Sequence, residues 1–244
     1  MSAETHEPAE FRAVLDALND YLHRELVPLG ELAEELAGTI DPEAVGALTD
    51  ADLAPLVPRI QGALADAPDF VGFGFAAAAG VMRDNDHYLL WYQRRESGLR
   101  RLNLNLSEGD PELYEYFDTE WFAGAERLRA PAIHGPYVDY AGADFLVLTA
   151  AVPVLVDERF VGVAGADIDP HRVEQALVHM LRGLPGEAVV VNDDRSVLAA
   201  NSARWMPGER VRVHPMKDRA SWQAVGAMTT WTGWTLALAP SSQA

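Results

Sequence analysis

The chain opens with apolar residues that recur every three or four positions. Because this is the period of an amphipathic helix, we expect a helix over residues 8–37, with a kink or a break at Pro28. Periodicity does not distinguish a core-facing stripe from a dimer seam, so the helix should dock on the chain or form a homodimer. The stripe consists of Phe11, Val14, Leu15, Leu18, Tyr21, Leu22, Leu26, Leu29, Leu32 and Leu36.

Helical and strand-like patterns follow one another in the next part of the chain. Residues 50–68 predict a second helix, and aromatic and small-residue runs at 69–82 and 87–95 predict two strands joined by a polar turn. Residues 107–128 predict a capped helix and a short turn. Two longer apolar runs then fill residues 135–169 and predict a hairpin.

The last third of the chain predicts a helix and a smaller group of strands. Asp169 suits an N-cap and Pro170 the first helical position, while glycines end the helix. The run 187–202 predicts a hairpin, and a final strand ends near Leu238.

The predicted fold class is therefore α+β: a long N-terminal helix followed by two antiparallel-sheet modules. The expected divisions are an N-terminal helical region (1–68), a larger module (69–168), a linking helix (169–184) and a smaller module (185–244).

Composition removes several function classes. The net charge of −18, from 37 acidic and 19 basic residues, disfavours nucleic-acid binding. The absence of cysteine excludes disulfides and zinc-thiolate sites. No apolar run is long enough to cross a membrane and the N-terminus does not resemble a signal peptide, so we expect no membrane partner and a cytoplasmic location.

Sequence motifs give little support to an enzyme. Gly72, Gly74 and Ala77 match the spacing of a dinucleotide fingerprint, but a turn and a strand are expected where the fingerprint requires a helix. The chain lacks the serine-hydrolase elbow, the phosphate-binding loop and the zinc-protease motif. His171 and His179 are two helical turns apart, too far to share a metal. We therefore predict no catalytic residue, cofactor or metal.

Residues 137–169, YVDYAGADFLVLTAAVPVLVDERFVGVAGADID, and the closing TGWTLALAP resemble the central hairpin and last strand of double Cache sensor domains. The resemblance covers about residues 8–240. It implies a long N-terminal helix, a larger ligand-binding PAS-like module and a smaller PAS-like module. Such domains are mostly extracytoplasmic receptor parts followed by a signalling module, so this chain resembles a free-standing member that signals through a separate partner.

The resemblance also implies a ligand site. Amino-acid-binding members hold the ligand ammonium with acidic residues and its carboxylate with an arginine and hydroxyls. Matching residues here are Tyr114, Trp121, Tyr137, Asp139 and Asp167. Thr119 stands at the arginine position and Phe122 at the second aromatic one, so the bidentate fork that a carboxylate prefers is missing.

This pattern favours a cationic amine without a carboxylate, such as a biogenic amine or a polyamine. Two carboxylates in an aromatic-lined cavity suit an ammonium group. The alternative is an amino-acid or carboxylate ligand held by Arg94 or Arg95, with Trp91 on the same strand and His134 near the cluster as further candidates.

The candidate residues could instead have ordinary structural roles. Asp139 and Asp167 could cap turns at strand ends, Trp121 and Phe122 could be core residues, and His134 could be structural. At the level of the whole chain, the prediction is a small-molecule sensor that acts through a transcriptional or signalling partner protein. The competing hypotheses are an interaction or scaffold protein without a ligand, and an enzyme that uses the aspartate pair.

Overall fold

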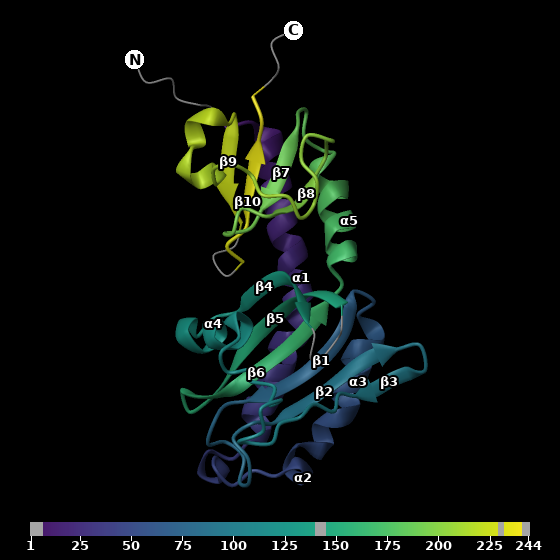
Figure 1. The fold of residues 1–244 in the computed structure, drawn as a ribbon, viewed down its shortest axis with the longest axis vertical. Coiled ribbons are helices and arrows are strands. Elements are labelled where there is room, and N and C mark those ends of the chain that lie inside the picture. The colour runs from purple at the N-terminus through teal and green to yellow at the C-terminus, as the bar shows by residue number, and fades with distance from the viewer. Residues whose placement is uncertain (1–6, 140–144, 229–231, 241–244) are drawn as a thin grey trace. The chain divides into compact units, whose positions relative to one another are not determined.

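The computed structural model describes residues 7–139, 145–228 and 232–240, and the chain divides into two compact units. The larger unit is Glu25–Pro170, and the smaller unit combines Met1–Arg24 with His171–Ala244. Helix α1 (Ala9–Thr39) contributes residues to both (Figure 1). With a long first helix and two antiparallel sheets, the predicted α+β class is confirmed.

The larger unit is built on a six-stranded antiparallel sheet with the order β3-β2-β1-β6-β5-β4. Its strands are β1 (Phe70–Ala77), β2 (Leu89–Arg95), β3 (Gly98–Arg101), β4 (Ala132–Asp139), β5 (Phe145–Val156) and β6 (Arg159–Ile168). Its helices are η1 (Pro42–Ala44), α2 (Asp50–Leu53), η2 (Ala54–Leu56), α3 (Val57–Asp66) and α4 (Glu120–Leu128). The predicted hairpin is β5 and β6. Residues 140–144, which the double Cache resemblance makes a polar turn, lie outside the described residues.

The smaller unit holds a four-stranded sheet with the order β8-β7-β10-β9. Its strands are β7 (Ala188–Val191), β8 (Val197–Ala200), β9 (Ala224–Ala227) and β10 (Thr235–Leu238). Its further helices are α5 (Pro170–Leu181), η3 (Pro215–Lys217) and η4 (Arg219–Ser221). The predicted helix after Ile168 and the predicted hairpin at 187–202 are both present. Short strands β3 and β9 were not predicted, because their sequences, GLRR and AVGA, contain neither a run of β-branched residues nor a clear apolar alternation.

Helix α1 does not break at Pro28. It continues for 31 residues, and the apolar side chains next to the proline, Leu26, Leu29 and Leu32, are all buried. Burial of this stripe outweighs the hydrogen bond that the proline cannot donate. The whole predicted stripe lies inside the chain and only Val27 stays exposed among the large apolar residues of α1, so the stripe supports docking rather than a homodimer seam.

Two predicted helices are shorter than expected. Residues 50–68 form three short helical pieces, because Pro55 and Pro58 interrupt the hydrogen-bond ladder. Within 107–128 only α4 is helical. The preceding residues run irregularly because Tyr116 turns inward, fully buried, and its hydroxyl donates a hydrogen bond to the Ala77 carbonyl (2.6 Å).

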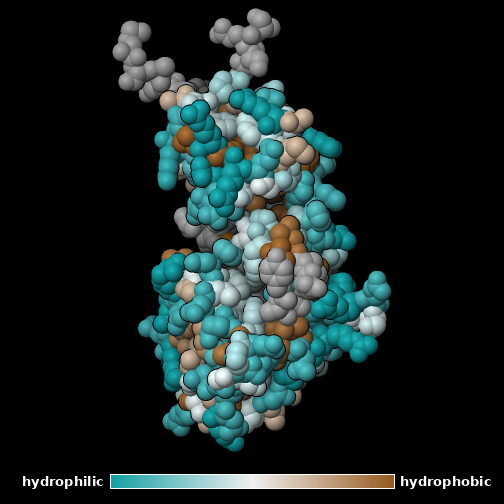
Figure 2. All heavy atoms as spheres, in the orientation of Figure 1, coloured by the Kyte–Doolittle hydropathy of each residue, from teal (hydrophilic) through white to brown (hydrophobic). Residues whose placement is uncertain are grey.

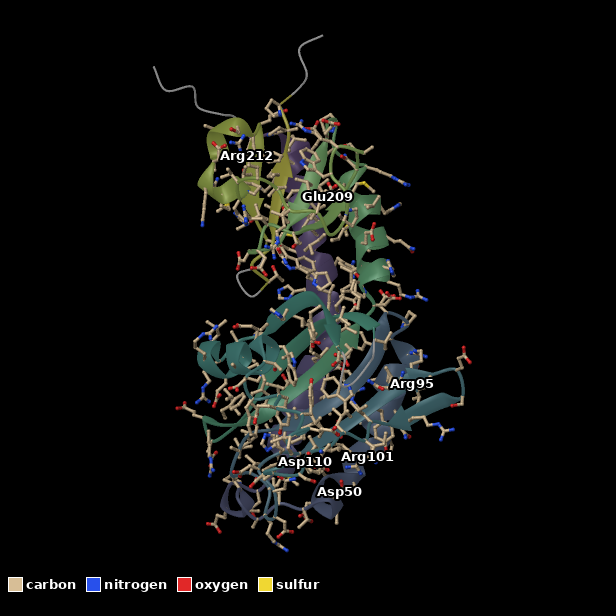
Figure 3. The ribbon with its side chains drawn as sticks, in the orientation of Figure 1. Asp50, Arg95, Arg101, Asp110, Glu209 and Arg212 are labelled. Carbon is tan, nitrogen blue, oxygen red and sulfur yellow. The ribbon has the colours of Figure 1, made fainter. Side chains whose placement is uncertain are left out.

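Polar and charged side chains cover most of the visible surface of each unit (Figure 2), in keeping with the acidic composition. Some of the charges are paired: Arg101 on β3 binds the Asp50 carboxylate at the start of α2 (Figure 3). None of the described helices is long and apolar enough to cross a membrane.

Candidate functional site

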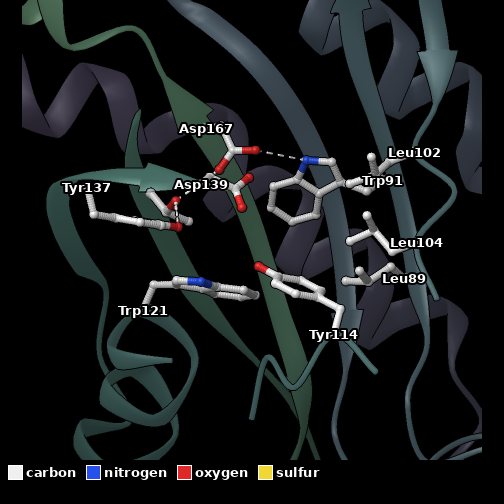
Figure 4. Close-up of a pocket in the computed structure, with 10 residues that line it drawn as sticks. Leu89, Trp91, Leu102, Leu104, Tyr114, Trp121, Tyr137, Asp139 and Asp167 are labelled. Atoms are coloured by element: carbon white, nitrogen blue, oxygen red, sulfur yellow. Dashed lines mark hydrogen bonds between the residues drawn. The ribbon is translucent and has the colours of Figure 1, made fainter. Parts of the chain in front are cut away.

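A pocket lies over the six-stranded sheet of the larger unit (Figure 4). Strands supply its carboxylates, while α4 and the irregular segment before it supply Trp121, Tyr114 and the leucines at 102 and 104. Its space is about 310 Å³ including the solvent-filled mouth, and its interior is narrow. The lining residues are Leu89, Trp91, Leu102, Leu104, Tyr114, Trp121, Tyr137, Asp139, Thr149 and Asp167.

Asp167 accepts two side-chain hydrogen bonds in the pocket. It stands on β6 opposite Thr149 of β5, whose hydroxyl donates to its Oδ1 (2.9 Å), and the Trp91 indole Nε1 donates to its Oδ2 (3.2 Å). Thr149 has one hydroxyl proton and gives it to Asp167, so the Tyr137 hydroxyl must be the donor in its 2.7 Å contact with Thr149. A chain of hydrogen bonds thus joins four strands around one carboxylate.

Glycines make room for this chain. A Cβ atom on Gly72 of β1 would lie 2.7 Å from both Asp167 Oδ2 and Trp91 Nε1, and one on Gly165 would lie 2.7 Å from the Trp91 ring. Gly74 is equally constrained, since its Cβ would lie 2.1 Å from the Leu90 carbonyl oxygen. The Gly-x-Gly spacing therefore serves close packing within a sheet and, as predicted, no helix follows it to form a dinucleotide site.

Burial and charge determine the protonation of the pocket. Burial, reinforced by the Asp139 charge, raises the pKa of Asp167 from 3.8 to about 7, although the Thr149 and Trp91 hydrogen bonds act in the opposite direction. Burial and the two carboxylates also raise the pKa values of Tyr114 and Tyr137. Both phenols therefore stay protonated at neutral pH and can donate hydrogen bonds to a ligand.

Replacing Thr149 by valine should raise the pKa of Asp167 further. Valine keeps the shape but removes the hydroxyl that favours the ionised carboxylate, so we expect a rise of about one unit, the usual effect of one hydrogen bond to a charge. A carbon-13 NMR titration of labelled aspartate in the ligand-free protein measures it. Thr149→Ser should keep the wild-type value; an unchanged pKa in the valine variant would contradict the arrangement.

Most of the site residues predicted from the sequence meet in this pocket: Trp91, Tyr114, Trp121, Tyr137, Asp139 and Asp167. Sequence reasoning missed Leu89, Leu102, Leu104 and Thr149. Signals for them existed: Leu89 shares a strand face with Trp91, Leu102 and Leu104 alternate with asparagines, and Thr149 lies in the hairpin that carries Asp167.

Three predicted site residues lie outside the lining for clear physical reasons. The Thr119 hydroxyl donates to the Tyr116 carbonyl (2.6 Å) where α4 begins, and Phe122 packs in the core against Tyr116 and Phe160. His134 contacts the Tyr137 ring, with centroids 5.6 Å apart, but does not reach the pocket lining.

The arginine alternative is not supported by the geometry. The Arg94 guanidinium donates to the main-chain carbonyls of Leu64, Ala67 and Phe70, so it ties β2 to the end of α3. Arg95 lies near the β2–β3 turn (Figure 3) and bonds Gln93. Among the described lining residues there is no arginine or lysine.

Comparison with known proteins supports a sensor. Residues 57–175, which contain the whole pocket, match the family model described as the first PDC sensor domain of methyl-accepting chemotaxis protein-like proteins. This segment is similar to PDC, or Cache-type, sensor domains. A PDC domain is a sensing module and not an enzyme family, and the Cache resemblance of the sequence is thereby confirmed.

Solved structures show the same fold beyond this PDC segment. The ligand-binding domain of the Campylobacter jejuni chemoreceptor Tlp3 with L-valine has a TM-score of 0.66 at 11% identity, covering 96% of this chain and 90% of that one. Methyl-accepting chemotaxis protein X has a TM-score of 0.57 at 18% identity, and the match covers 95% of this chain and 94% of that one. At such identities the likeness shows the double-module fold alone. No curated protein matches the chain.

Proposed function

We propose that the larger unit binds a small cationic metabolite whose ammonium group lies between Asp139 and Asp167. One observation carries this proposal. Two carboxylates, each less than a tenth exposed, share one end of an aromatic pocket whose described lining contains no arginine or lysine (Figure 4).

The physical chemistry of the pocket favours such a ligand. Two neighbouring buried carboxylates repel, and the raised pKa of Asp167 expresses this together with burial. An ammonium group offers three donors and a charge opposite to that of the carboxylates. The rings of Trp91, Trp121 and Tyr114 stand around the same space and could add cation–π attraction. The narrow interior favours a small head group.

An α-amino acid is the second candidate, for a separate reason. The Trp121 indole N–H is buried without a hydrogen bond of good geometry, and the Tyr114 hydroxyl beside it is protonated. These two neutral donors could bind a carboxylate without an arginine. The solved Tlp3 domains with L-valine and isoleucine are amino-acid complexes of the same fold, which makes this candidate worth testing.

A thermal-shift screen at pH 8 separates the candidates, because a ligand that binds the folded state raises the melting temperature. Primary amines, α-amino acids and carboxylic acids of matched size are compared. If the proposal holds, amines raise the melting temperature; a response to amino acids alone favours the second candidate. Stabilisation by carboxylic acids alone would contradict both.

The pH dependence tests the role of Asp167 in the same screen. A bound cation needs the ionised carboxylate, and the amine itself stays charged, so affinity should fall as the pH drops through about 7. Binding at pH 6 should be about tenfold weaker than at pH 8, since a pKa of 7 leaves about a tenth of the carboxylate ionised. Isothermal calorimetry measures this ratio; equal affinities would remove Asp167 from the site.

We further propose that ligand binding is reported through a separate signalling protein. The family match supports a sensing role, while the partner and the cytoplasmic location stay predictions from the sequence. A ligand-free interaction protein remains the competing hypothesis. It would show no thermal shift with any compound in the screen and yet retain a regulator as a partner.

A further inference from the structure

The residues that would touch a ligand are almost closed to solvent. Trp91, Trp121 and Asp167 are each 4–6% exposed, and Thr149 is 1% exposed. A ligand that contacts Asp167 must therefore pass through the narrow interior of the pocket, and movement of part of the wall would widen this path. Strands β1, β5 and β6 each pair with neighbours on both sides, which makes the sheet the stiffer side of the pocket.

The other side is the cover segment, residues 102–119, which joins β3 to α4 without forming a helix or a strand. It brings Leu102, Leu104 and Tyr114 to the pocket. The Leu102 amide donates to the Trp91 carbonyl (2.7 Å), and the Tyr114 amide donates to the Asn105 carbonyl (2.9 Å), which closes the segment into a loop. Without ladder hydrogen bonds, such a segment opens more easily than the sheet.

The cover segment is fastened to the loop between β1 and β2. Next to β2, His87 Nε2 lies 3.1 Å from both carboxylate oxygens of Glu115. A carboxylate only accepts, so this nitrogen carries the proton. The His87 ring also packs on Phe117, with centroids 4.4 Å apart. Further along the loop, Asn85 Nδ2 donates to the Leu106 carbonyl (2.8 Å).

Tyr116 also holds the cover segment, but unlike the His87–Glu115 contact it is fully buried. Its ring is fully buried, and its hydroxyl both donates to the Ala77 carbonyl and accepts from the Tyr88 amide (3.0 Å). Glu115, by contrast, is exposed at the surface. The geometry is that of a fixed pivot at Tyr116 with a releasable contact beside it.

We propose that residues 102–115 act as the door of the pocket, and that the His87–Glu115 pair is the latch that sets how often the door opens. The latch works through the position of Tyr114, one residue from Glu115, and neither latch residue lines the pocket. This inference does not depend on which ligand the pocket takes.

The absence of cysteine permits a direct test. In the full chain, Leu89→Cys places one thiol in the pocket wall, and its reaction with a disulfide reagent at pH 8 measures opening. With His87→Phe, which keeps the ring, or Glu115→Ala, labelling should be about fivefold faster, the factor for losing one partly exposed hydrogen-bonded pair. The double variant should be no faster than either single one, since both break the same contact.

Two controls separate a latch from general loosening. Glu112→Gln removes a charge from an exposed position of the same segment and should leave labelling unchanged. A thiol at Val189, fully buried in the smaller unit, should label at the same rate with and without the latch. If the His87 and Glu115 variants leave labelling of the pocket thiol unchanged, the door is elsewhere; if they accelerate both thiols equally, they report unfolding. Either result would overturn the proposal without affecting the amine hypothesis.

Discussion

Asp167→Asn should have opposite effects on binding and on stability. Removing the charge takes one of two carboxylate partners from a bound ammonium group in a buried site, which costs about 3–5 kcal/mol and weakens amine binding at least a hundredfold. The same change removes a buried charge from the ligand-free protein and should stabilise it at pH 8. Calorimetry of an amine from the screen and chemical denaturation measure the two effects.

The size and pH range of the stability effect follow from the pKa. The folded-state pKa of Asp167 is raised from 3.8 to about 7, so the folded protein holds this proton more tightly than the unfolded one. The stability that this bound proton contributes amounts to roughly 4 kcal/mol. It is lost as the pH rises from about 4 to about 7. Asparagine can accept from the Trp91 indole through Oδ1 and donate to Thr149 Oγ1 through its amide, but the Thr149 and Tyr137 hydroxyl protons must then turn round. We therefore expect a net gain of only about 1–3 kcal/mol.

Asp157→Asn is the matched control. Asp157 is exposed in the turn between β5 and β6 with a φ of 47°, a conformation that asparagine tolerates. It should change neither amine binding nor the slope of stability against pH. If Asp167→Asn behaves like this control in both measurements, Asp167 is an ordinary strand-end residue and the ammonium site is wrong.

Gly72→Ala should disrupt the pocket by displacing Asp167 and Trp91, which pack directly on this glycine. The new methyl group would lie 2.7 Å from Asp167 Oδ2 and Trp91 Nε1, so both side chains must move and their hydrogen bond must break. Overpacking of this kind costs about 1–3 kcal/mol of stability. Amine affinity should fall at least tenfold, because the carboxylate loses its fixed position. Denaturation midpoints and calorimetry measure the two losses.

Gly62→Ala provides the comparison for that variant. Gly62 is exposed within α3, with nothing within 4 Å of the position of a Cβ atom. There the substitution should stabilise the protein by up to about 1 kcal/mol through helix propensity. If Gly72→Ala were equally harmless, the tight packing of Trp91 against β1 would be wrong.

Periodicity predicted the parts of the fold that are long and half-buried. The stripe of α1, the aromatic and small-residue runs of β1 and β2 and the cap of α5 are local patterns, which the sequence displays directly. The cover segment was mistaken for a helix because Pro111 and Glu112 follow an aspartate in the manner of a helix start. The burial of Tyr116 against Ala77, a contact across 39 residues, outweighs that local signal.

The site could be predicted only as far as motifs mark it. Tyr137, Asp139 and Asp167 stood out in a recognisable hairpin, and all three line the pocket. Thr149 and Leu104 were missed because their role depends on which strands become neighbours. Arg94 was misjudged for the same reason: its carbonyl partners come from α3 and β1, and the sequence gives no sign that these lie within its reach.

One part of the pocket wall is a hydrogen-bonded sheet and the other is the cover segment, which forms no strand. This difference affects how the sequence of such a sensor can change during evolution. The acidic groups stand on strands whose neighbours fix them, so changing them disturbs the fold. The residues at 103–114 belong to no strand and can be exchanged, lengthened or shortened at little thermodynamic penalty. Descendants of this protein could therefore acquire new preferences for the body of a ligand while inheriting the same charged recognition end.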